Sequence, residues 1–189
     1  MSHDVRIRHI SDGDWGGIVA LESRTYAALG LSEERAALES RVHASPSTCF
    51  VLELGQQLAG YLLALPYPAF RYPDLTRTEE TVFPSRNLHL HDLVIAENLR
   101  GRGLAQHLLH HVTATAGAQG YEQISLVAVA GSAAFWAANG FVAHDEAVPA
   151  ESYGANAVYM FRPVRTGRAG NPEPAGMVPS GSSSQCEVG

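Results

Sequence analysis

The order of apolar and polar residues divides the first part of the chain into one strand, two helices and a hairpin. Residues 5–10 alternate between apolar and polar side chains, which is the pattern of a half-buried strand. Residues 11–26 and 32–45 each open on a helix-capping signal and are predicted to be helical. Residues 48–54 and 58–65 are apolar and rich in strand formers, so with the short turn between them they predict a hairpin.

Serines mark the expected starts of the two helices. Ser11 is followed three residues later by Asp14, the spacing of a capping box. Ser32 is the expected cap of the second helix, where Glu33 and Glu34 are well placed against the positive end of the helix dipole.

The rest of the chain continues the alternation of strands and helices. A helix is expected over residues 104–116, because Leu104, Leu108, Leu109, Val112 and Ala116 form one apolar stripe. The other expected elements are strands at 88–95, 123–129, from 141 and at 157–164, and a short helix at 132–139 capped by Ser132.

A glycine-rich loop lies between the strand at 88–95 and the helix that follows it. Gly101 and Gly103 allow backbone N–H groups to turn inward, and the first turn of the helix adds further unpaired donors and the positive end of its dipole. Such a loop binds phosphate. Arg100 and Arg102 add fork-shaped cationic donors, which suit a pyrophosphate or a ribose phosphate; the alternative is a structural turn that caps a core helix.

Two common nucleotide-binding motifs do not fit this loop. A Walker loop needs a lysine, and every basic residue of the chain apart from histidine is arginine. A dinucleotide fingerprint needs a third glycine where Gln106 stands, and it normally follows the first strand of the domain.

The loop resembles motif A of the GNAT superfamily of N-acetyltransferases, with Arg100, Gly103 and Ala105 at its defining positions. The resemblance continues into the preceding strand and the aromatic segment 135–141, and it covers most of residues 4–164. It implies the GNAT fold, an α/β (α+β) domain in which a mixed twisted sheet, flanked by helices, splays open between its fourth and fifth strands.

The resemblance also implies that acetyl-coenzyme A is the cofactor. In that family the loop binds the pyrophosphate, and the pantetheine arm lies along the strand before it. The cofactor-binding residues so implied are Leu93, Val94, Ile95, Arg100, Gly101, Arg102, Gly103, Leu104, Ala105, Ser132, Phe135 and Trp136.

His89 and His91 are the candidate bases for deprotonating an amine. Alternation places both imidazoles on one face of their strand and Asp92 on the other, unless a bulge interrupts the strand. Imidazole titrates near neutral pH, so either can accept a proton from an ammonium group. The pair resembles the paired histidines of arylalkylamine N-acetyltransferases, which implies that role; either could instead be a hydrogen-bonded core histidine.

The usual general acid of the family is missing from this sequence. Trp136 stands where the family usually has tyrosine, and its indole N–H is no acid near neutral pH. Tyr153 is the leading replacement; Tyr159, a relay through Ser132, or departure of an unprotonated thiolate are alternatives. Val129 also stands where the family often has a cofactor-binding asparagine.

The segment 66–87 is rich in proline and aromatic residues and breaks every periodicity, so it predicts a long loop. The resemblance places a substrate-covering insertion here; a structural loop that packs on the sheet is the alternative. The substrate-binding candidates are Tyr26, Tyr67, Phe70, Tyr72 and Phe83.

Composition narrows the remaining classes. A net charge of −6 and scattered arginines argue against a nucleic-acid partner. No apolar run is long enough to span a membrane, the N-terminus lacks a signal peptide, and Cys49 and Cys186 make no disulfide framework, so we expect a cytoplasmic protein.

His107, His110 and His111 lack a further ligand nearby, and no metal site is predicted. We expect one domain at 1–165 and a disordered Gly/Ser/Pro-rich tail at 166–189.

Three functions remain open. The first is acetyl transfer to the primary amine of a small molecule, with the aromatic insertion favouring an aromatic one. The second is transfer to an amino acid, antibiotic, polyamine, peptide or protein, with Asp74, Glu79 or Glu80 holding a cation. The third is a non-catalytic acyl-CoA sensor, suggested by Trp136. A homodimer is compatible with the resemblance.

Overall fold

The computed structural model describes residues 4–165, and the predicted tail at 166–189 lies outside them. One seven-stranded sheet, in the order β1-β2-β3-β4-β5-β7-β6, forms its centre. The strands are β1 (Val5–His9), β2 (Phe50–Leu54), β3 (Gln57–Pro66), β4 (Asn87–Ile95), β5 (Gln123–Ala128), β6 (Val142–Ala147) and β7 (Val158–Pro163).

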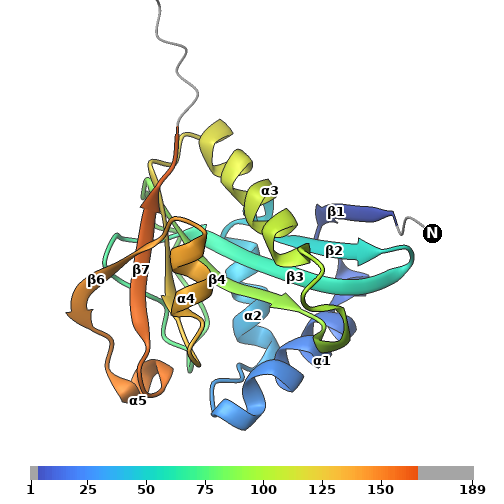
Figure 1. Cartoon of the computed structure of the whole chain (residues 1–189), viewed down its shortest axis with the longest axis horizontal. Helices are drawn as coiled ribbons and strands as arrows, with labels where there is room; N and C mark the ends of the chain where they lie inside the picture. Colours follow the sequence, from blue (N-terminus) through green and yellow to red (C-terminus); the bar gives the residue numbers. More distant parts are fainter. Residues whose placement is uncertain (1–3, 166–189) are drawn as a thin grey trace, which may run out of the picture.

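Helices cover both faces of the sheet (Figure 1). They are α1 (Trp15–Tyr26), α2 (Arg35–Ala44), α3 (Leu104–Ala118), α4 (Ala133–Ala138) and the short α5 (Ala150–Tyr153). In Figure 1, α3 and α4 lie in front of the sheet, and α1 and α2 lie behind it. None of the helices in residues 4–165 is long and apolar enough to cross a membrane.

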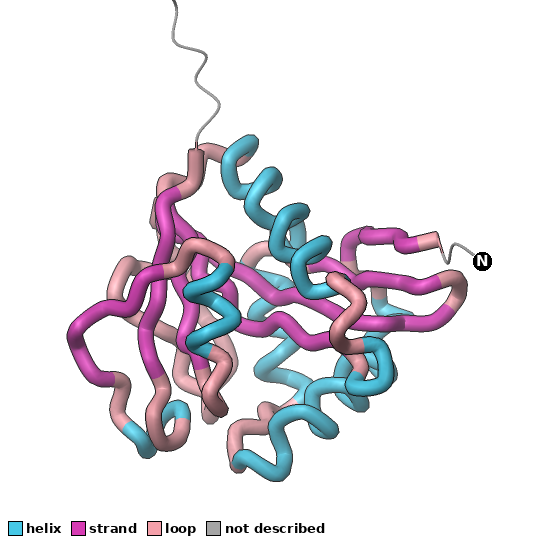
Figure 2. The backbone as a smooth tube through the Cα atoms, in the orientation of Figure 1, coloured by secondary structure: helices cyan, strands magenta, loops and turns pink. Residues whose placement is uncertain are grey.

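The sheet consists of two groups of strands that fan apart (Figure 2). In one group the strands β1, β2, β3 and β4 pair antiparallel in that order. In the other group β7 pairs antiparallel with both β5 and β6. The groups meet through a short parallel contact between β4 and β5. This is the predicted mixed sheet, and the sequence order of strands and main helices is confirmed.

The predicted apolar stripe of α3 is buried in full against the sheet. Each buried leucine or valine of this kind stabilises the fold by about 1.5–3 kcal/mol relative to exposure. The stripe packs on β2, β3 and β4, so it holds the start of α3 at the end of β4.

The two predicted helix caps have different outcomes. The Asp14 carboxylate accepts a hydrogen bond from the Ser11 N–H at 2.8 Å, which confirms the capping box at the turn before α1. The predicted cap at Ser32 is wrong, because α2 begins at Arg35 and the Ser32 hydroxyl instead donates to Glu22 at 2.6 Å. The polar groups of this segment are therefore directed toward buried partners rather than toward the helix end.

A β-bulge interrupts β4 at His91. Strand β3 pairs Leu63 with Asp92 and Ala64 with Leu90, so His91 is the extra residue. The simple alternation that points Asp92 away from His91 is therefore wrong: one ligand atom each of Glu33, His91 and Asp92 lie within 4.8 Å of one another. The bulge brings two neighbouring polar side chains to one place.

The long loop between β3 and β4 is anchored to the domain at several points. The Tyr153 hydroxyl donates to the Pro73 carbonyl at 2.8 Å, and the Phe70 N–H donates to the Tyr159 hydroxyl at 2.9 Å. Arg41 of α2 also donates to the Asp74 carbonyl at 3.0 Å. The loop thus closes over one end of the sheet, and helix α5, which the sequence pattern did not indicate, supports it.

Candidate active site

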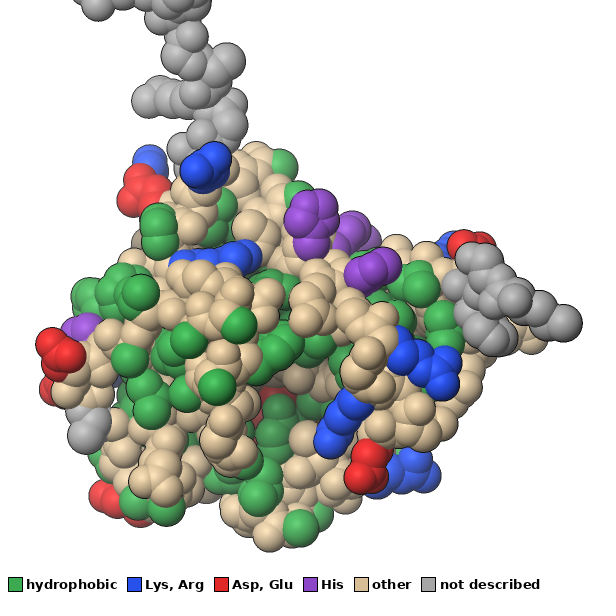
Figure 3. Space-filling model, in the orientation of Figure 1, with side chains coloured by type: hydrophobic (Ala, Val, Ile, Leu, Met, Phe, Trp, Pro, Cys, Tyr) green, Lys and Arg blue, Asp and Glu red, His purple; other side chains and the backbone are tan. Residues whose placement is uncertain are grey.

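A cleft opens where β4 and β5 diverge. The two strands pair from Asn87 to His89, and beyond this point they enclose a cleft of about 640 Å³. Its walls are the C-terminal half of β4, the end of β5, the loop before α3, and α4. Figure 3 shows the hollow on this face, with hydrophobic side chains along its walls and acidic atoms at its floor.

The edge of β4 that faces the cleft has free backbone groups. Strand β3 pairs with the other edge of β4, from Gly60 to Pro66. Beyond His89, the N–H and C=O groups directed toward β5 have no strand partner among the described residues. An extended ligand arm can pair with this edge as an additional strand would.

Two glycines shape the loop at the mouth of the cleft. Gly101 has φ of 76° and Gly103 has φ of 77°, in the left-handed region that favours glycine. A Cβ at either position would meet no atom within 4 Å, so both glycines border open space. Gly103 is also the N-cap of α3 and has no side chain to cap it, so the N–H groups of the first turn stay available to an anion.

The two loop arginines are placed differently. Arg100 lines the cleft and donates from Nε to the Ile95 carbonyl at 3.2 Å, which leaves its terminal nitrogens available. Arg102 is exposed and does not line the cleft. All the other cofactor-binding residues implied by the resemblance lie on the cleft wall: Leu93, Val94, Ile95, Gly101, Gly103, Leu104, Ala105, Ser132, Phe135 and Trp136.

A smaller chamber of about 40 Å³ adjoins the cleft. The two share the side chains of Tyr26, His91, Val127 and Val129. The remaining chamber residues are Glu22, Leu31, Glu33, Leu75, Asp92 and Tyr153. A ligand in the cleft and a small group in the chamber would therefore meet at His91.

His91 is held by a buried ion-pair network. Its Nε2 contacts Glu33 Oε1, and Arg41 donates to Glu33 Oε2 at 2.5 Å and to Glu79 Oε1 at 2.9 Å. Burial would raise the pKa of Glu33, but His91 and Arg41 outweigh it and hold that pKa below its ordinary value. Glu33 is therefore ionised and can only accept hydrogen bonds.

The charge of Glu33 decides the tautomer of His91. Arg41 Nε also lies 3.0 Å from His91 Nε2, but one ring nitrogen cannot accept from Arg41 and donate to Glu33 at once. We assign the hydrogen to Nε2, because Glu33 Oε1 has no other donor among the described residues, whereas Arg41 keeps acceptors at Glu33, Glu79 and the Asp74 carbonyl. The lone pair of the neutral ring then lies on Nδ1, which is buried and has no partner among the described residues.

Asp92 is the second buried acid next to His91. Its carboxylate accepts a hydrogen bond from the Tyr61 hydroxyl at 2.9 Å. Burial raises the pKa of Asp92 to about 6, with His91 opposing the rise and Glu33 adding to it. Burial and the charge of Asp92 also hold the pKa of Tyr26 well above its ordinary value, so that hydroxyl stays protonated.

The structure separates His89 from the cleft. The ring of His89 lies 6.4 Å from that of His91, but its side chain is buried and lines neither the cleft nor the chamber. Nδ1 of His89 lies 3.1 Å from the Ser125 hydroxyl. Burial, assisted by His91 and Arg41, holds the pKa of His89 well below its ordinary value, so the ring stays neutral.

Comparison with known proteins identifies the family. The model of the acetyltransferase (GNAT) family matches residues 15–141. The chain belongs to the GNAT acetyltransferase family. A comparison of this GNAT sequence with curated protein sequences finds no match.

Solved GNAT structures share the fold of this chain. Ard1 from Thermoplasma volcanium aligns with a TM-score of 0.66 at 18% identity, over 85% of this chain and 97% of its own. PaiA N-acetyltransferase from Thermoplasma acidophilum, solved in complex with coenzyme A, gives 0.62 at 14% identity, over 85% and 99%. An acetyltransferase from Thermus thermophilus gives 0.58 at 25% identity, over 86% and 99%. The predicted fold and acetyl-CoA as the cosubstrate of this GNAT protein are confirmed.

The tyrosine expected to act as acid in this GNAT protein faces the chamber, not the cleft. Tyr153 lines the chamber, and its hydroxyl proton is engaged by the Pro73 carbonyl. Burial holds the pKa of Tyr153 well above its ordinary value. Trp136 does line the cleft, with its ring against Phe135 and Phe141 at centroid distances of 5.0 and 5.4 Å, but its indole N–H is not acidic enough to protonate the leaving group near neutral pH.

The aromatic residues considered for substrate binding are spread over the molecule. Tyr26 lines both cavities. Tyr72 packs edge-on against Tyr153 at 5.2 Å, and Phe70 is half exposed and lies against Tyr159 at 5.9 Å. These loop aromatics therefore hold the loop against the domain rather than lining the cleft.

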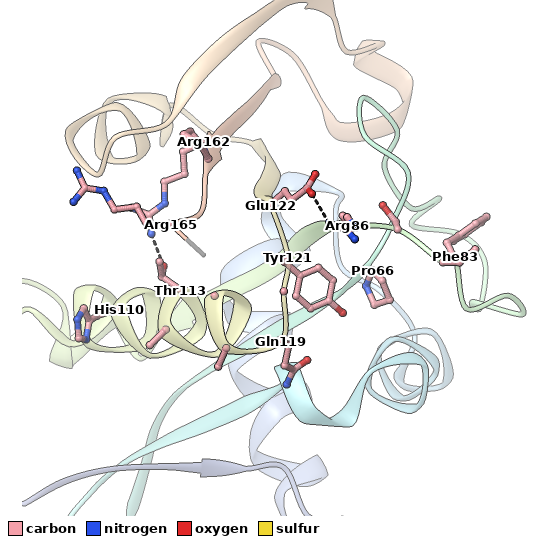
Figure 4. A pocket seen from close by; sticks show the side chains of 17 residues that line it. Pro66, Phe83, Arg86, His110, Thr113, Gln119, Tyr121, Glu122, Arg162 and Arg165 are labelled. Atoms are coloured by element: carbon pink, nitrogen blue, oxygen red, sulfur yellow. Dashed lines mark hydrogen bonds and ion pairs between the residues drawn. The ribbon is translucent and has the colours of Figure 1, made fainter. Parts of the chain in front are cut away.

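The other two aromatic candidates lie together, with ring centroids of Tyr67 and Phe83 4.8 Å apart. Phe83 lines a separate groove of about 1340 Å³ near the end of α3 (Figure 4). This groove shares no lining residue with the cleft, and its Arg86 is paired with Glu122 at 2.5 Å.

Three functional residues were not found from the sequence. Glu22, Glu33 and Arg41 form the buried polar wall beside His91. Glu33 was expected to interact with a helix dipole, and the other two carried no motif. The signal that could have found them is a charged residue at a buried position of an amphipathic helix, as Arg41 is in α2.

Proposed function

We propose that this protein transfers the acetyl group of acetyl-CoA to the primary amine of a small molecule, with His91 as the base. The observation that carries the proposal is the state of His91. It lies where the cleft and the chamber meet, Glu33 fixes its Nε2, and its Nδ1 has no partner among the described residues.

The cleft suits the cosubstrate in shape and in chemistry. The N–H groups at the start of α3, together with Arg100, would bind the pyrophosphate. The open edge of β4 between Leu93 and Ile95 would pair with the pantetheine arm. Bound in this way, acetyl-CoA supplies an activated acetyl group as a thioester.

His91 would prepare the acceptor for attack. The amine enters as an ammonium ion, and His91 Nδ1 accepts its proton and releases the nucleophilic lone pair. Glu33 stabilises the imidazolium formed, since it lies against the opposite nitrogen. A backbone N–H of the open β4 edge would donate to the acetyl oxygen as negative charge develops there.

The leaving group needs no acid from the protein in this scheme. The amine nitrogen forms its bond to the acetyl carbon, the carbon–sulfur bond breaks, and the electron pair leaves with sulfur. The second proton of the amine nitrogen then passes to the departing thiolate, so that the products are the amide and free coenzyme A thiol. A thiol pKa of about 8.5 makes the thiolate a tolerable leaving group. The engaged hydroxyl of Tyr153 supports this choice over acid catalysis by that residue.

The size of the chamber favours a small acceptor over a folded protein surface. It is enclosed by side chains of α1, the long loop and β5 together with Tyr153 of α5, and it measures about 40 Å³. A slender amine could reach His91 through so narrow a space.

The test combines cofactor binding with turnover. Thermal shift and calorimetry with acetyl-CoA should show saturable binding, and a thiol-release assay should show turnover with primary amines. The His91→Ala variant should bind acetyl-CoA as the wild type does but turn over at least about 100-fold more slowly. Tight binding without transfer to any amine would instead identify an acyl-CoA sensor, and turnover restricted to peptides would refute the small-molecule acceptor.

A further inference from the structure

The chamber beside His91 is lined by three buried carboxylates. Glu22, Glu33 and Asp92 are 1%, 8% and 7% exposed, respectively, and all three line the same space. The Glu22 carboxylate accepts hydrogen bonds from the Ser32 hydroxyl at 2.6 Å and from the Glu33 N–H at 2.7 Å. These contacts hold its position without neutralising its charge.

Positive charge around the chamber is limited. None of the described residues that line the chamber is an arginine. Arg41, behind Glu33, is shared with Glu79 and cannot neutralise all the carboxylates. Burying several like charges is costly: burial is the main cause that raises the pKa of Asp92, and the charge of Glu33 adds to the rise. A cation in the chamber would therefore be stabilised.

His91 gives a separate indication that a ligand belongs here. Its side chain is 1% exposed and lines the chamber, yet Nδ1 has no hydrogen-bond partner in the described part of the chain. A buried polar atom without a partner costs about 1–3 kcal/mol. The ammonium group of an acceptor is a donor that would satisfy Nδ1.

The walls of the chamber limit the rest of the acceptor. Besides the acids it is lined by Leu31, Leu75, Val127 and Val129. A volume of about 40 Å³ accommodates only a few atoms, since a single water needs about 10–15 Å³ of the same space. The space suits an ammonium group and the methylene carbons next to it, and a branch at the first carbon would meet these walls.

We infer that the acceptor is an aliphatic primary amine, unbranched at the carbon next to nitrogen and without a carboxylate nearby. This rests on the proposed function, because the same His91 receives the proton. An α-amino acid is excluded because its carboxylate would lie against Glu33 and Asp92, and in every α-amino acid except glycine the first carbon is also branched. The N-terminus of a peptide that begins with any residue other than glycine is excluded by the branch alone.

Three matched acceptors test the inference on the wild-type protein. Pentylamine has the preferred shape, norleucinamide adds a neutral branch, and norleucine adds a branch with a carboxylate. We expect kcat/KM to fall in that order, with at least about 100-fold between pentylamine and norleucine. A kcat/KM for norleucine within tenfold of the value for pentylamine would overturn the inference.

A conservative variant tests the role of charge. Glu22→Gln keeps the shape and an acceptor oxygen but removes one carboxylate, so it should raise KM for pentylamine about tenfold. It should also reduce the ratio of kcat/KM for pentylamine to kcat/KM for norleucine. The KM for acetyl-CoA should not change. Glu39→Gln, which removes a carboxylate paired with Arg35 on the surface of α2, is the matched control and should leave the ratio unchanged. An unchanged ratio in Glu22→Gln would contradict the inference.

Two further measurements keep the outcomes separate. Thermal unfolding checks that Glu22→Gln is folded, and Asp92→Asn, which retains an acceptor for Tyr61, takes its place if it is not. Calorimetry of each acceptor in the presence of coenzyme A measures binding without turnover. Saturable binding of pentylamine without acetylation would refute the proposed function while supporting the chamber as an ammonium site. Equal turnover of all three acceptors would support acetyl transfer and refute the inferred specificity.

Discussion

The Glu33 carboxylate contacts Nε2 of His91, although the two residues are 58 positions apart in the sequence. Glu33 lies just before α2 and His91 lies at the bulge of β4, so the contact joins the helical layer to the sheet at the cleft. The contact fixes the ring and leaves Nδ1 without a partner among the described residues. Variants of this network and of the loop before α3 should therefore have separable effects on catalysis, cofactor binding and stability.

The two histidines of β4 should respond differently to replacement. His91→Ala should lower kcat by about 10²–10⁴ and be partly rescued by added imidazole, because it removes the base but leaves space for one. His89→Ala should keep kcat within about threefold but lower stability by about 1–3 kcal/mol, since it removes a buried ring and one of the two partners of the buried Ser125 hydroxyl, the other being Asn87. Steady-state kinetics with and without imidazole, together with urea unfolding, measure both effects. A larger loss of kcat in the His89 variant would reverse the assignment.

The two loop arginines should differ in cofactor binding. Arg100→Ala should weaken acetyl-CoA binding about 10–100-fold, the value of one charge-assisted hydrogen bond to phosphate. Arg102→Ala should change it by less than about threefold, because Arg102 is exposed and lies off the cleft wall. Calorimetric titration with acetyl-CoA measures the affinity of both variants. An equal loss of affinity in the two would show that the pyrophosphate contacts Arg102 as well as Arg100.

Removing Arg41 should destabilise the fold strongly. Its side chain is fully buried between Glu33 and Glu79, so Arg41→Met leaves the buried Glu33 and the largely buried Glu79 without their cation and should cost about 3–5 kcal/mol. Arg35→Met is the control on the same helix: Arg35 is exposed and pairs with Glu39, and its loss should cost less than about 1 kcal/mol. Urea unfolding measures both, and a similar cost for the two would show that the buried network is not stabilising.

Asp92 should make the fold less stable as pH rises. Its pKa is raised to about 6 in the folded protein and is about 3.9 in the unfolded chain, so the folded state holds the proton more tightly. The free energy of unfolding should fall between about pH 4 and 6, and Asp92→Asn should be more stable than the wild type at pH 8 by up to about 3 kcal/mol. Near pH 3.5 the free energies of unfolding of Asp92→Asn and of the wild type should be similar.

Asp14 is the control for Asp92, because it should make the fold more stable as pH rises. The hydrogen bond from Arg8 is the largest cause that lowers the pKa of Asp14 to about 2, so its contribution to stability is present above about pH 4 and is lost as pH falls through 2. Asp14→Asn should therefore be less stable than the wild type at pH 8 and approach it in acid. Urea unfolding at pH 2, 3.5, 6 and 8 tests both variants. Parallel behaviour of the two aspartates would contradict the opposite environments assigned to them.

Much of the fold followed from local patterns. The apolar stripe of α3, the hairpin of β2 and β3, and the glycine loop at Gly101 and Gly103 are short-range features. Each depends on residues near one another in the chain, so periodicity, turn residues and capping residues indicate them without any tertiary information. Motif A and the aromatic segment of α4 also come together on one cleft wall, because the fold that they implied is the one formed.

The surroundings of His91 were decided by tertiary structure. The bulge at His91 depends on register with β3, and the pairing of Glu33 with Arg41 and His91 depends on how α2 packs against the sheet. Local rules placed Glu33 at a helix dipole and Asp92 on the opposite face, because a single sequence shows which side chains are charged but not which distant charges they meet. The sequence by itself determined the strands, the main helices, the fold and the glycine loop before α3. Only the folded structure, in which burial makes unpaired charges costly, brought three acids and one histidine to the end of the cleft.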